Sequence, residues 1–357
     1  PAYYGLYGYI DEYGYSIVED PEKPVKGMHG ELIEQGAKSY IAKRRIGLKG
    51  STLAGEKRKY PIHIDEAFIQ EGKLSPFDII KLNEQISYNN DLNHTIQTGN
   101  FVWTDRENNQ VGWQPSESGR WSQVWLPHPD QRCTVKLSGR HTKPGNYELS
   151  VAGCDPFDHN ITTDNKKSNG ASYVFRKFDP MDERSSNMFV CEYVNRPATA
   201  DMFYEDMVKQ CIFYGCELLC ENNKIGLINW FENNGYGAYL MERPAGTHTE
   251  YSKDKQKIKG IPMSGEAVRS QAITVTEAYI YENVGRDYNT NQIGKVFFNK
   301  LCKCWLQLNP QKWTDYDEFV GAVLCLFGAQ RYRPMSKERK RVRMVKKYSN
   351  KSNRRRR

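Results

Sequence analysis

The clearest hydrophobic pattern of the chain is a series of short apolar runs with polar turns between them. These runs cover 147–154, 171–178 and 188–194. Apolar runs of this length, bounded by Pro, Gly or Asn, are typical of buried strands. Because no helical pattern separates them, we expect three antiparallel strands that follow one another in a meander.

A helix and a fourth strand are predicted after the meander. From about 201 to 214, apolar side chains recur every three to four positions, and Gly215 ends the run. The next apolar run, 216–221, predicts strand four. A helical crossover is long enough to bring strand four beside strand one in parallel.

Further helices are indicated toward the C-terminus. Helical spacing of apolar residues recurs over about 225–233, 265–283, 292–307 and 315–330, and a brief fifth strand is expected at 238–241. The order β-β-β-α-β-α predicts an α/β fold with a mixed sheet, in which three antiparallel strands come first, parallel strands follow, and helices flank the sheet.

The pattern before residue 147 is less regular. A helix is expected within 30–45, helical structure over 60–95, and short strands over 99–126, where four Trp residues serve as packing anchors. Residues 128–146 are polar and basic, with Pro and Gly, and are interpreted as a linker.

These patterns divide the chain into three parts. An α+β N-terminal segment covers 1–145, a second domain covers 146–330, and a basic tail covers 331–357. The length of 357 residues is sufficient for two domains.

Hydropathy argues against a membrane span, and the first residue bears on how the chain is interpreted. The mean hydropathy is −0.76, and no apolar run approaches the roughly 18 residues that a span needs. No signal-peptide pattern is present. Because Pro1 stands where an initiator Met is expected, we interpret the chain as a fragment or processed product, with a further N-terminal domain missing.

The positive charge is concentrated in the tail. Residues 331–357 contain 14 Lys and Arg and one acid, whereas the other 330 residues carry 37 basic and 42 acidic groups. A basic tail on a mildly acidic body favours a polyanionic partner. The alternative is a solvated, unstructured tail.

The cysteines favour a reducing compartment. Their number, nine, is odd, most lie inside apolar runs, and no Cys-x-x-Cys pair or neighbouring His cluster exists. We therefore expect reduced thiols rather than disulfides or a zinc site.

The first candidate for chemistry is Asp155, which ends strand one and is followed by Pro156. Proline cannot donate to a sheet ladder, so the strand stops there and leaves an acid at its C-terminal end. Chemistry in α/β folds is often located at such strand ends. The alternative is an ordinary Asp-Pro turn.

Strand four also ends in an acid, Glu221. If strands one and four are parallel, both carboxylates reach the same sheet edge, and like charges so close are unfavourable without a cation between them. Oxygen ligands suit Mg²⁺ or Mn²⁺, and two such ions can activate water and stabilise the leaving oxygen in phosphodiester cleavage. The alternative is a strand-end acid paired with a nearby Lys or Arg.

The helix at 315–330 supplies a third acid. Asp317 shares a stripe with Val320 and Gly321, which directs the carboxylate toward the sheet. The alternative is a capping box, in which Thr314 is the N-cap and an acid follows three residues later.

The order and spacing of these motifs resemble the ribonuclease H-like nucleases. Within that group the chain resembles the C-terminal nuclease domain of the large terminase subunit of tailed bacteriophages. The residues that carry the resemblance are Val-Ala-Gly-Cys-Asp-Pro at 151–156, Cys-Glu-Asn-Asn at 220–223 and Tyr-Asp-Glu-Phe-Val-Gly-Ala at 316–322. The segment 60–68 is similar to one near the end of the family's ATPase region. The likeness covers about 145–330 well and 1–145 loosely.

The resemblance implies metal-dependent cutting of concatemeric viral DNA by a two-metal endonuclease of the genome-packaging motor. It implies double-stranded DNA, the portal protein, the small terminase subunit and the ATPase domain of the full-length protein as partners, and no membrane. The implied location is the host cell cytoplasm, with a transient stay at the procapsid portal vertex. The family's phosphate loop is absent here, so no ATPase activity is expected from this chain alone.

The resemblance also assigns roles to single residues, with two Mg²⁺ or Mn²⁺ ions as cofactors. The residues assigned to catalysis and metal binding are Asp155, Glu221 and Asp317. Further candidate ligands are Asp158, Asp164 and Glu318. The family's commoner third motif is a pair of Asp residues, so Asp315, Asp317 and Glu318 all stay candidates for the third ligand.

Two basic stretches are candidates for DNA contact. Four lysines alternate and would share one face of an extended segment: Lys253, Lys255, Lys257 and Lys259. In the resembled family a hairpin here lies near the active site, which favours phosphate contact; the alternative is a Lys-guarded edge strand. Candidates in the tail are Arg339, Lys340 and Arg341.

Two other functions fit the same residues. One is another ribonuclease H-like nuclease, such as a resolvase or transposase. The other is a non-catalytic module that grips DNA or docks on the portal, in which the acids are structural.

Overall fold

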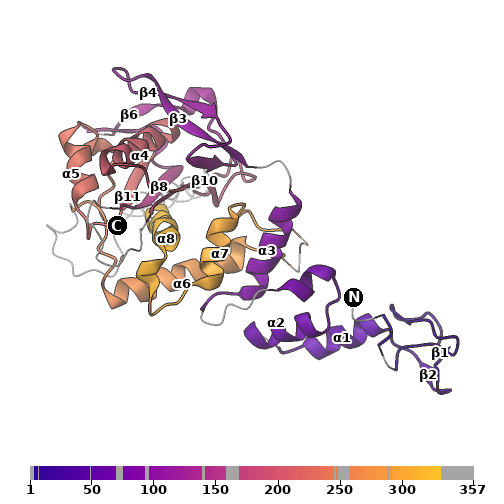
Figure 1. Ribbon diagram of the computed structural model, residues 1–357. Helices are drawn as coiled ribbons and strands as arrows, with labels where there is room; N and C mark the ends of the chain where they lie inside the picture. Colours follow the sequence, from indigo (N-terminus) through magenta and orange to yellow (C-terminus); the bar gives the residue numbers. More distant parts are fainter. Residues whose placement is uncertain are drawn as a thin grey trace, which may run out of the picture. The chain divides into compact units, whose positions relative to one another are not determined.

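The computed structural model contains two compact units (Figure 1). The first comprises Pro1–Asn93 and Glu277–Trp313, and the second comprises His94–Thr276 and Thr314–Arg357. The residues that the structure describes are 4–6, 8–48, 50–69, 75–92, 96–138, 141–157, 169–244, 247, 258–287, 290 and 292–330.

The second unit is built around a seven-stranded mixed sheet (Figure 1). Its strands are β3 (Gln97–Asp105), β4 (Gln110–Pro115), β5 (Trp121–Gln123), β8 (Ser150–Asp155), β9 (Gly170–Arg176), β10 (Met188–Asn195) and β11 (Glu217–Cys220). Their order in space is β11-β8-β9-β10-β5-β3-β4.

The central strands pair as the sequence predicts. β8, β9 and β10 form an antiparallel meander, with Ala152 opposite Val174 in the first pair. β11 returns parallel to β8, and Cys220 is opposite Cys154. The predicted fold class is therefore confirmed, because this order of antiparallel and parallel strands with flanking helices is ribonuclease H-like.

Helix α4 (Ala200–Tyr214) makes the crossover from β10 to β11. Its N-terminus is capped by the Thr199 hydroxyl, which accepts the Met202 N–H at 3.3 Å. Gly215 ends it in the left-handed region, with φ of 59°, a conformation that glycine adopts without strain. The predicted helix over 201–214 is confirmed.

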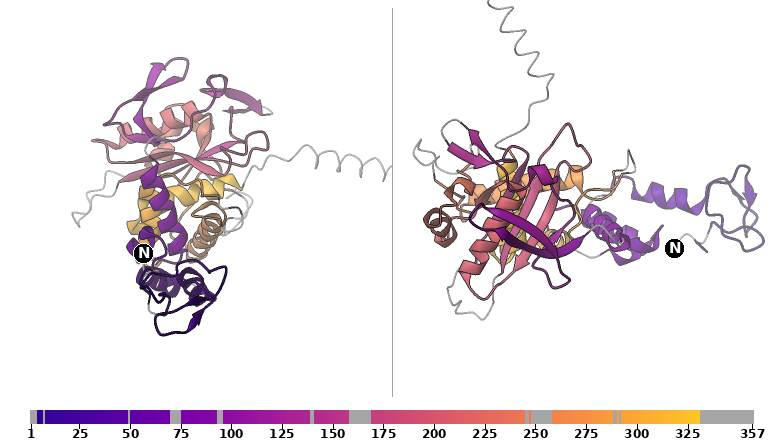
Figure 2. Two further views of the ribbon diagram at one scale, coloured as in Figure 1. Left: turned by 90° about the vertical axis from the view of Figure 1, so that its right-hand side faces the viewer. Right: turned by 90° about the horizontal axis from the view of Figure 1, so that it is seen from above.

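Helices lie on both faces of the sheet (Figures 1 and 2). α4 covers one face, where the Gln210 amide donates to the Ser172 hydroxyl of β9 at 2.8 Å. α8 (Asp317–Ala329) covers the other face, against β8 and β9. The short helix α5 (Gly226–Asn233) follows β11 and packs beside α4.

Glycines let α8 approach the sheet at backbone distance. A Cβ on Gly153 of β8 would lie 2.3 Å from the Gly321 carbonyl oxygen of α8. A Cβ on Gly321 would lie 3.1 Å from the Ala171 carbonyl oxygen of β9. Because Asp317 lies one turn before Gly321, this close packing holds the start of α8 near the end of β8.

The first unit contains the N-terminal elements and α7. Its elements are β1 (Val25–Lys26), β2 (Leu32–Ile33), α1 (Ala37–Arg45), α2 (Gly50–Lys59), a 3-10 helix (Ile64–Phe68), α3 (Ile79–Asp91) and α7 (Asn299–Gln307). α6 (Glu266–Asn283) crosses from one unit to the other. Helices α3 and α7 pack together, and the Asn89 amide of α3 donates to the Asn299 side chain of α7 at 2.9 Å.

The strands predicted within 99–126 belong to the large sheet rather than to a separate segment. β5 pairs with β10, with Gln123 opposite Cys191, and β3 pairs with β5. The two compact units therefore divide the chain elsewhere than at residue 145. No local pattern predicts this pairing, because it joins strands about 70 residues apart.

Three predictions for single elements are wrong. Residues 128–146 are not a linker but contain a hairpin of β6 (Val135–Ser138) and β7 (His141–Pro144). Residues 238–241 begin in a 3-10 helix, Gly237–Tyr239, and only an isolated bridge joins Leu240 to Leu218. α7 begins at Asn299 rather than 292, because Gly294 and Lys295 donate their backbone N–H groups to Gly285 and Asn283 instead of to a helical partner.

Two findings concern the whole described chain. None of the described helices is long and apolar enough to cross a membrane. All nine cysteines are free thiols, and eight of them are buried.

Candidate active site

Asp155 is the last residue of β8 and is only 7% exposed. Side chains alternate along a strand, so Asp155 shares its face with Gly153, which is the face that α8 covers. The strand stops there because Pro156 follows. A carboxylic acid is thereby buried at the C-terminal end of a central strand.

Glu221 lies beside Asp155 at the end of the neighbouring strand. It follows β11 directly, and its backbone N–H donates to the Cys154 carbonyl oxygen at 3.0 Å. The parallel register therefore continues one residue past β11 and sets Glu221 next to Asp155 on the same face. A parallel bridge from Glu221 to Ile261 secures its other side.

Asp317 arrives from α8. It is the first residue of that helix, and its Oδ2 accepts the backbone N–H of Asn169 at 2.9 Å. The N-cap of α8 is Tyr316 rather than Thr314 and makes no side-chain cap hydrogen bond, so the expected capping box is wrong, although Asp317 does lie in the first turn, where an acid stabilises the helix dipole. The expected stripe with Gly321 is confirmed, since Gly321 packs against β9.

These three carboxyl groups act on one another electrostatically. Burial, and then the nearby carboxylates of Glu221 and Asp317, raise the pKa of Asp155 well above its usual range. A hydrogen bond with the Glu221 carboxyl raises this pKa further, and the Lys224 ammonium opposes the shift. Asp317, at the start of α8, is thus linked electrostatically to Asp155.

The chemistry of the site suits a hard divalent cation. Its donors are carboxylate oxygens, and a cation between Asp155 and Glu221 would relieve the repulsion that raises the pKa of Asp155. Among the described residues, no three or more His, Cys, Asp or Glu side chains lie close enough together to hold a metal ion. The donor set fits Mg²⁺ or Mn²⁺.

Polar residues that sequence reasoning missed support the acids. The Asn223 amide donates to Glu221 Oε1 at 2.5 Å, and Lys224 Nζ donates to the Pro156 carbonyl oxygen at 3.2 Å. The signal for both was their place directly after strand four. The backbone N–H of Asn169 had no sequence signal, because any residue could supply it.

Some predicted site residues lie outside the described residues: Asp158, Asp164, Lys253, Lys255, Lys257, Arg339, Lys340 and Arg341. Lys259 is described, and its Nζ donates to the Leu240 carbonyl oxygen at 3.1 Å. It lies 3.9 Å from a carboxylate oxygen of Glu242. The role of these residues in DNA binding stays a prediction.

Comparisons with known proteins found similarity in structure only. No family model matches the chain, and no curated protein matches it. The zinc-bound large terminase nuclease of the thermophilic phage G20c is 10% identical, with a TM-score of 0.36, over 59% of this chain and 88% of that one. A second structure of the G20c nuclease is 10% identical, with a TM-score of 0.36, over 70% of this chain and 100% of that one.

The nuclease domain of the Thermus phage P74-26 large terminase was also found. It is 11% identical, with a TM-score of 0.35, over 62% of this chain and 90% of that chain. These solved structures come from the family that the sequence motifs resemble. Likeness at this level says nothing of activity, which has to be inferred from the chain's own carboxyl groups.

Proposed function

We propose that this protein is a metal-dependent DNA endonuclease that hydrolyses phosphodiester bonds. The observation that supports the proposal is the meeting of three acids from distant parts of the chain. Asp155, Glu221 and Asp317 converge at one end of the sheet, and their proximity raises the pKa of the buried Asp155. A purely structural carboxylate would be expected to have a cationic partner instead.

In the proposed site, Asp155 and Glu221 would bridge or hold the divalent ions, and Asp317 would complete the second ion's site. Such ions supply activation of water and stabilisation of the leaving oxygen. Asp158 and Glu318 are the further candidate ligands. The oxygen ligands favour Mg²⁺ and Mn²⁺ as the ions.

The protein's own groups would orient the acids. Asn223 fixes one oxygen of Glu221, and the Asn169 N–H fixes one oxygen of Asp317. Lys224 ties the Pro156 carbonyl and so holds the end of β8 in place. Burial and the neighbouring carboxylates raise the pKa of Asp155, and a bound cation would favour its ionised form.

The proposed biological setting is viral genome packaging, with concatemeric double-stranded DNA as substrate. The portal protein, the small terminase subunit and an ATPase domain are proposed partners on the strength of the motif resemblance. The phosphate contacts of such an enzyme dominate its affinity, so binding should depend weakly on sequence and strongly on salt.

A plasmid digestion assay with Mn²⁺ or Mg²⁺ tests the proposal. We expect the wild-type protein to cut supercoiled plasmid, EDTA to stop the reaction, and Asp155→Asn to be inactive. The matched control is Asp130→Asn, a change of the same kind at a side chain that is 87% exposed, and it should cut normally. If Asp155→Asn, Glu221→Gln and Asp317→Asn all cut like wild type, the proposed site is wrong.

The same assay separates the two alternatives. A strong preference for four-way junctions over plasmid would assign the site to a resolvase. Binding of DNA with no cleavage in either metal would favour the non-catalytic module, in which the acids are structural.

A further inference from the structure

The helices α1 and α2 of the first unit both end in basic residues. α1 ends in Lys43, Arg44 and Arg45, and α2 ends in Lys57, Arg58 and Lys59. Basic residues in the last turn of a helix stabilise its dipole, which explains one or two basic residues at each helix end. It does not explain why some of the six face the interior and others face the solvent. The inward-facing and outward-facing basic residues have different kinds of neighbours.

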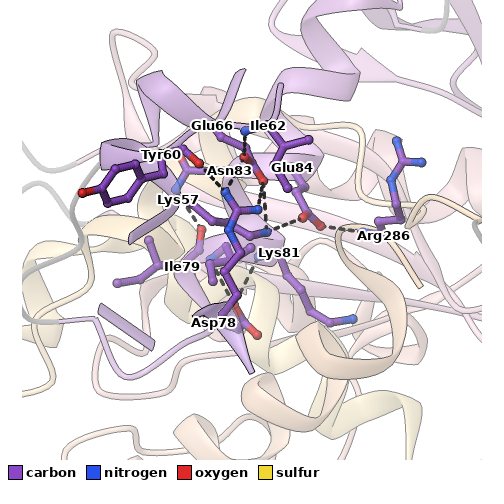
Figure 3. Close-up of polar contacts among 12 residues, drawn as sticks. Lys57, Tyr60, Ile62, Glu66, Asp78, Ile79, Lys81, Asn83, Glu84 and Arg286 are labelled. Carbon is purple, nitrogen blue, oxygen red and sulfur yellow. Dashed lines mark hydrogen bonds and ion pairs between the residues drawn. The ribbon is translucent and has the colours of Figure 1, made fainter. Parts of the chain in front are cut away.

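The inward-facing cations are neutralised by acids. Arg45 makes two hydrogen bonds of 2.9 Å to the Glu66 carboxylate, and Lys57 lies 3.3 Å from Glu84 and 3.8 Å from Glu66. Figure 3 shows Lys57, Glu66 and Glu84 turned toward one another, whereas the Tyr60 ring points away from them. This inner cluster is a structural ion pair network that ties α2 and α3 to the segment after α2.

Two of the outward-facing cations, Arg44 and Lys59, lie against tyrosine rings, whereas Lys43 Nζ donates to the Gln35 side-chain oxygen at 2.8 Å. The Arg44 guanidinium lies 5.8 Å from the centre of the Tyr40 ring and 4.6 Å from that of Tyr60. Lys59 Nζ lies 5.5 Å from the centre of the Tyr60 ring. Helical spacing sets Lys43 on the same side of α1 as Tyr40 and Arg44.

This set, Tyr40, Lys43, Arg44, Lys59 and Tyr60, is named the basic face. Lys43, Arg44 and Lys59 are exposed, and both tyrosines are half-buried. Glu56 pairs with Arg44 at 2.8 Å but is largely covered, with 14% of its side chain exposed. The face thus presents positive charge on a body that is otherwise mildly acidic.

We propose that the basic face binds the phosphate backbone of double-stranded nucleic acid. Lys and Arg provide the charge that phosphates select, and a guanidinium held against tyrosine rings is fixed in place before its ligand arrives. Lys is depleted from the cores of protein–protein interfaces, so a face centred on two lysines and an arginine fits a nucleic acid better than a protein.

The inference extends the proposed function by a second DNA contact, in the unit that lacks the acidic site. It does not depend on cleavage. It is tested with the 357-residue chain carrying Asp155→Asn, without divalent metal, so that binding is measured with no cutting.

The first test is acetylation of lysine amines, read by mass spectrometry, with and without a duplex of about 30 base pairs. We expect the duplex to protect Lys43 and Lys59. Lys300, Lys303 and Lys312 are exposed lysines of the same unit and serve as internal controls that keep their reactivity. Unchanged reactivity of Lys43 and Lys59 overturns the proposal, as does equal protection by polyglutamate, which would assign the face to an acidic protein.

The second test is fluorescence anisotropy of the same duplex. The variant Lys43→Gln, Arg44→Gln, Lys59→Gln should bind about tenfold more weakly, and its salt dependence should fall by about two to three phosphate contacts. The control variant Lys300→Gln, Lys303→Gln, Lys312→Gln removes the same charge elsewhere in the unit. Equal affinity of the two variants contradicts the proposal, while failure of the nuclease alone would appear only in the plasmid assay.

Discussion

Glu66 in the first unit and Asp155 in the second are both acids that folding removes from water, but their surroundings are opposite. Glu66 is surrounded by cations, since Arg45 hydrogen-bonds to it, and Figure 3 shows Lys57 nearby. Asp155 is surrounded by anions, since Glu221 and Asp317 are its main electrostatic neighbours.

The pKa values move in opposite directions for this reason. Burial alone would raise the pKa of Glu66, but hydrogen bonds from Arg45 and from the Ile62 N–H outweigh it and hold the pKa below its usual value. Burial and neighbouring carboxylates both raise the pKa of Asp155. An acid with its partners supplied is part of the scaffold, and an acid whose partner is missing marks a place for a ligand.

The largest effect expected from this comparison is on catalysis. Asp155→Asn should lower plasmid cleavage by about 10³-fold or more, because it removes several kcal/mol of transition-state stabilisation by the metal. Glu66→Gln should cut like wild type once folded. Initial rates of supercoiled plasmid loss measure cleavage by both variants. If Glu66→Gln lost as much cleavage as Asp155→Asn, the contrast between a structural acid and a catalytic acid would be contradicted.

The second effect is on stabilisation by divalent metal. Metal that binds the folded state at a hundredfold excess over its Kd adds about 2.7 kcal/mol to the free energy of unfolding. Wild type and Glu66→Gln should both gain Tm when Mn²⁺ is added, whereas Asp155→Asn should gain little. Differential scanning fluorimetry gives the shifts, and an equal gain in all three proteins would place the metal elsewhere.

The third effect is on stability without metal. Glu66→Gln leaves the Arg45 guanidinium without its carboxylate, and we expect the free energy of unfolding to fall by about 2 kcal/mol. Glu12→Gln is the control, because Glu12 pairs with Lys26 at the surface at 3.1 Å, where ion pairs contribute little. Chemical denaturation followed by Trp fluorescence compares them, and equal losses in both variants would contradict the buried role of Glu66.

The smallest effect is on the pH dependence of stability. Because the pKa of Asp155 is raised, folded protein binds more protons than unfolded protein above the usual carboxyl pKa, so stability falls as pH rises. Asp155→Asn should therefore stabilise the metal-free protein near pH 7, and this gain should vanish as the pH falls to the usual carboxyl pKa of about 4.

Glu66 should give the opposite sign. Its lowered pKa contributes stability above the usual carboxyl pKa, and this contribution is lost as pH falls through the folded-state pKa. The destabilisation caused by Glu66→Gln should thus shrink toward acid pH. Denaturation curves across the pH range in EDTA measure both variants, and parallel pH profiles would show that the two environments do not differ as described.

Much of the second unit could be predicted from local pattern. The apolar runs located β8, β9, β10 and β11, and the crossover rule set β11 beside β8 in parallel. Those two results are sufficient to bring Asp155 and Glu221 together, since both follow from where strands end. The apolar stripe of α8 predicted the place of Asp317, because residues on one face of a helix point toward the same neighbour.

The rest depends on contacts between distant residues. The addition of β5 to β10 has no local signature, and neither has the N–H of Asn169 that orients Asp317. The ion pairs of Glu66 were also missed, because charge counting does not reveal which of the six basic residues at the ends of α1 and α2 turn inward. Such features appear only when the chain is folded.

The close packing of α8 on β8 has a consequence for the order of events during synthesis. The backbone contact of Gly321 with Gly153 joins segments that leave the ribosome about 170 residues apart. A nascent chain that has reached residue 300 carries Asp155 and Glu221 but lacks both Asp317 and the helix that covers their face of the sheet. The proposed cutting centre would therefore be completed only when translation has passed α8, so incomplete chains would be harmless to DNA.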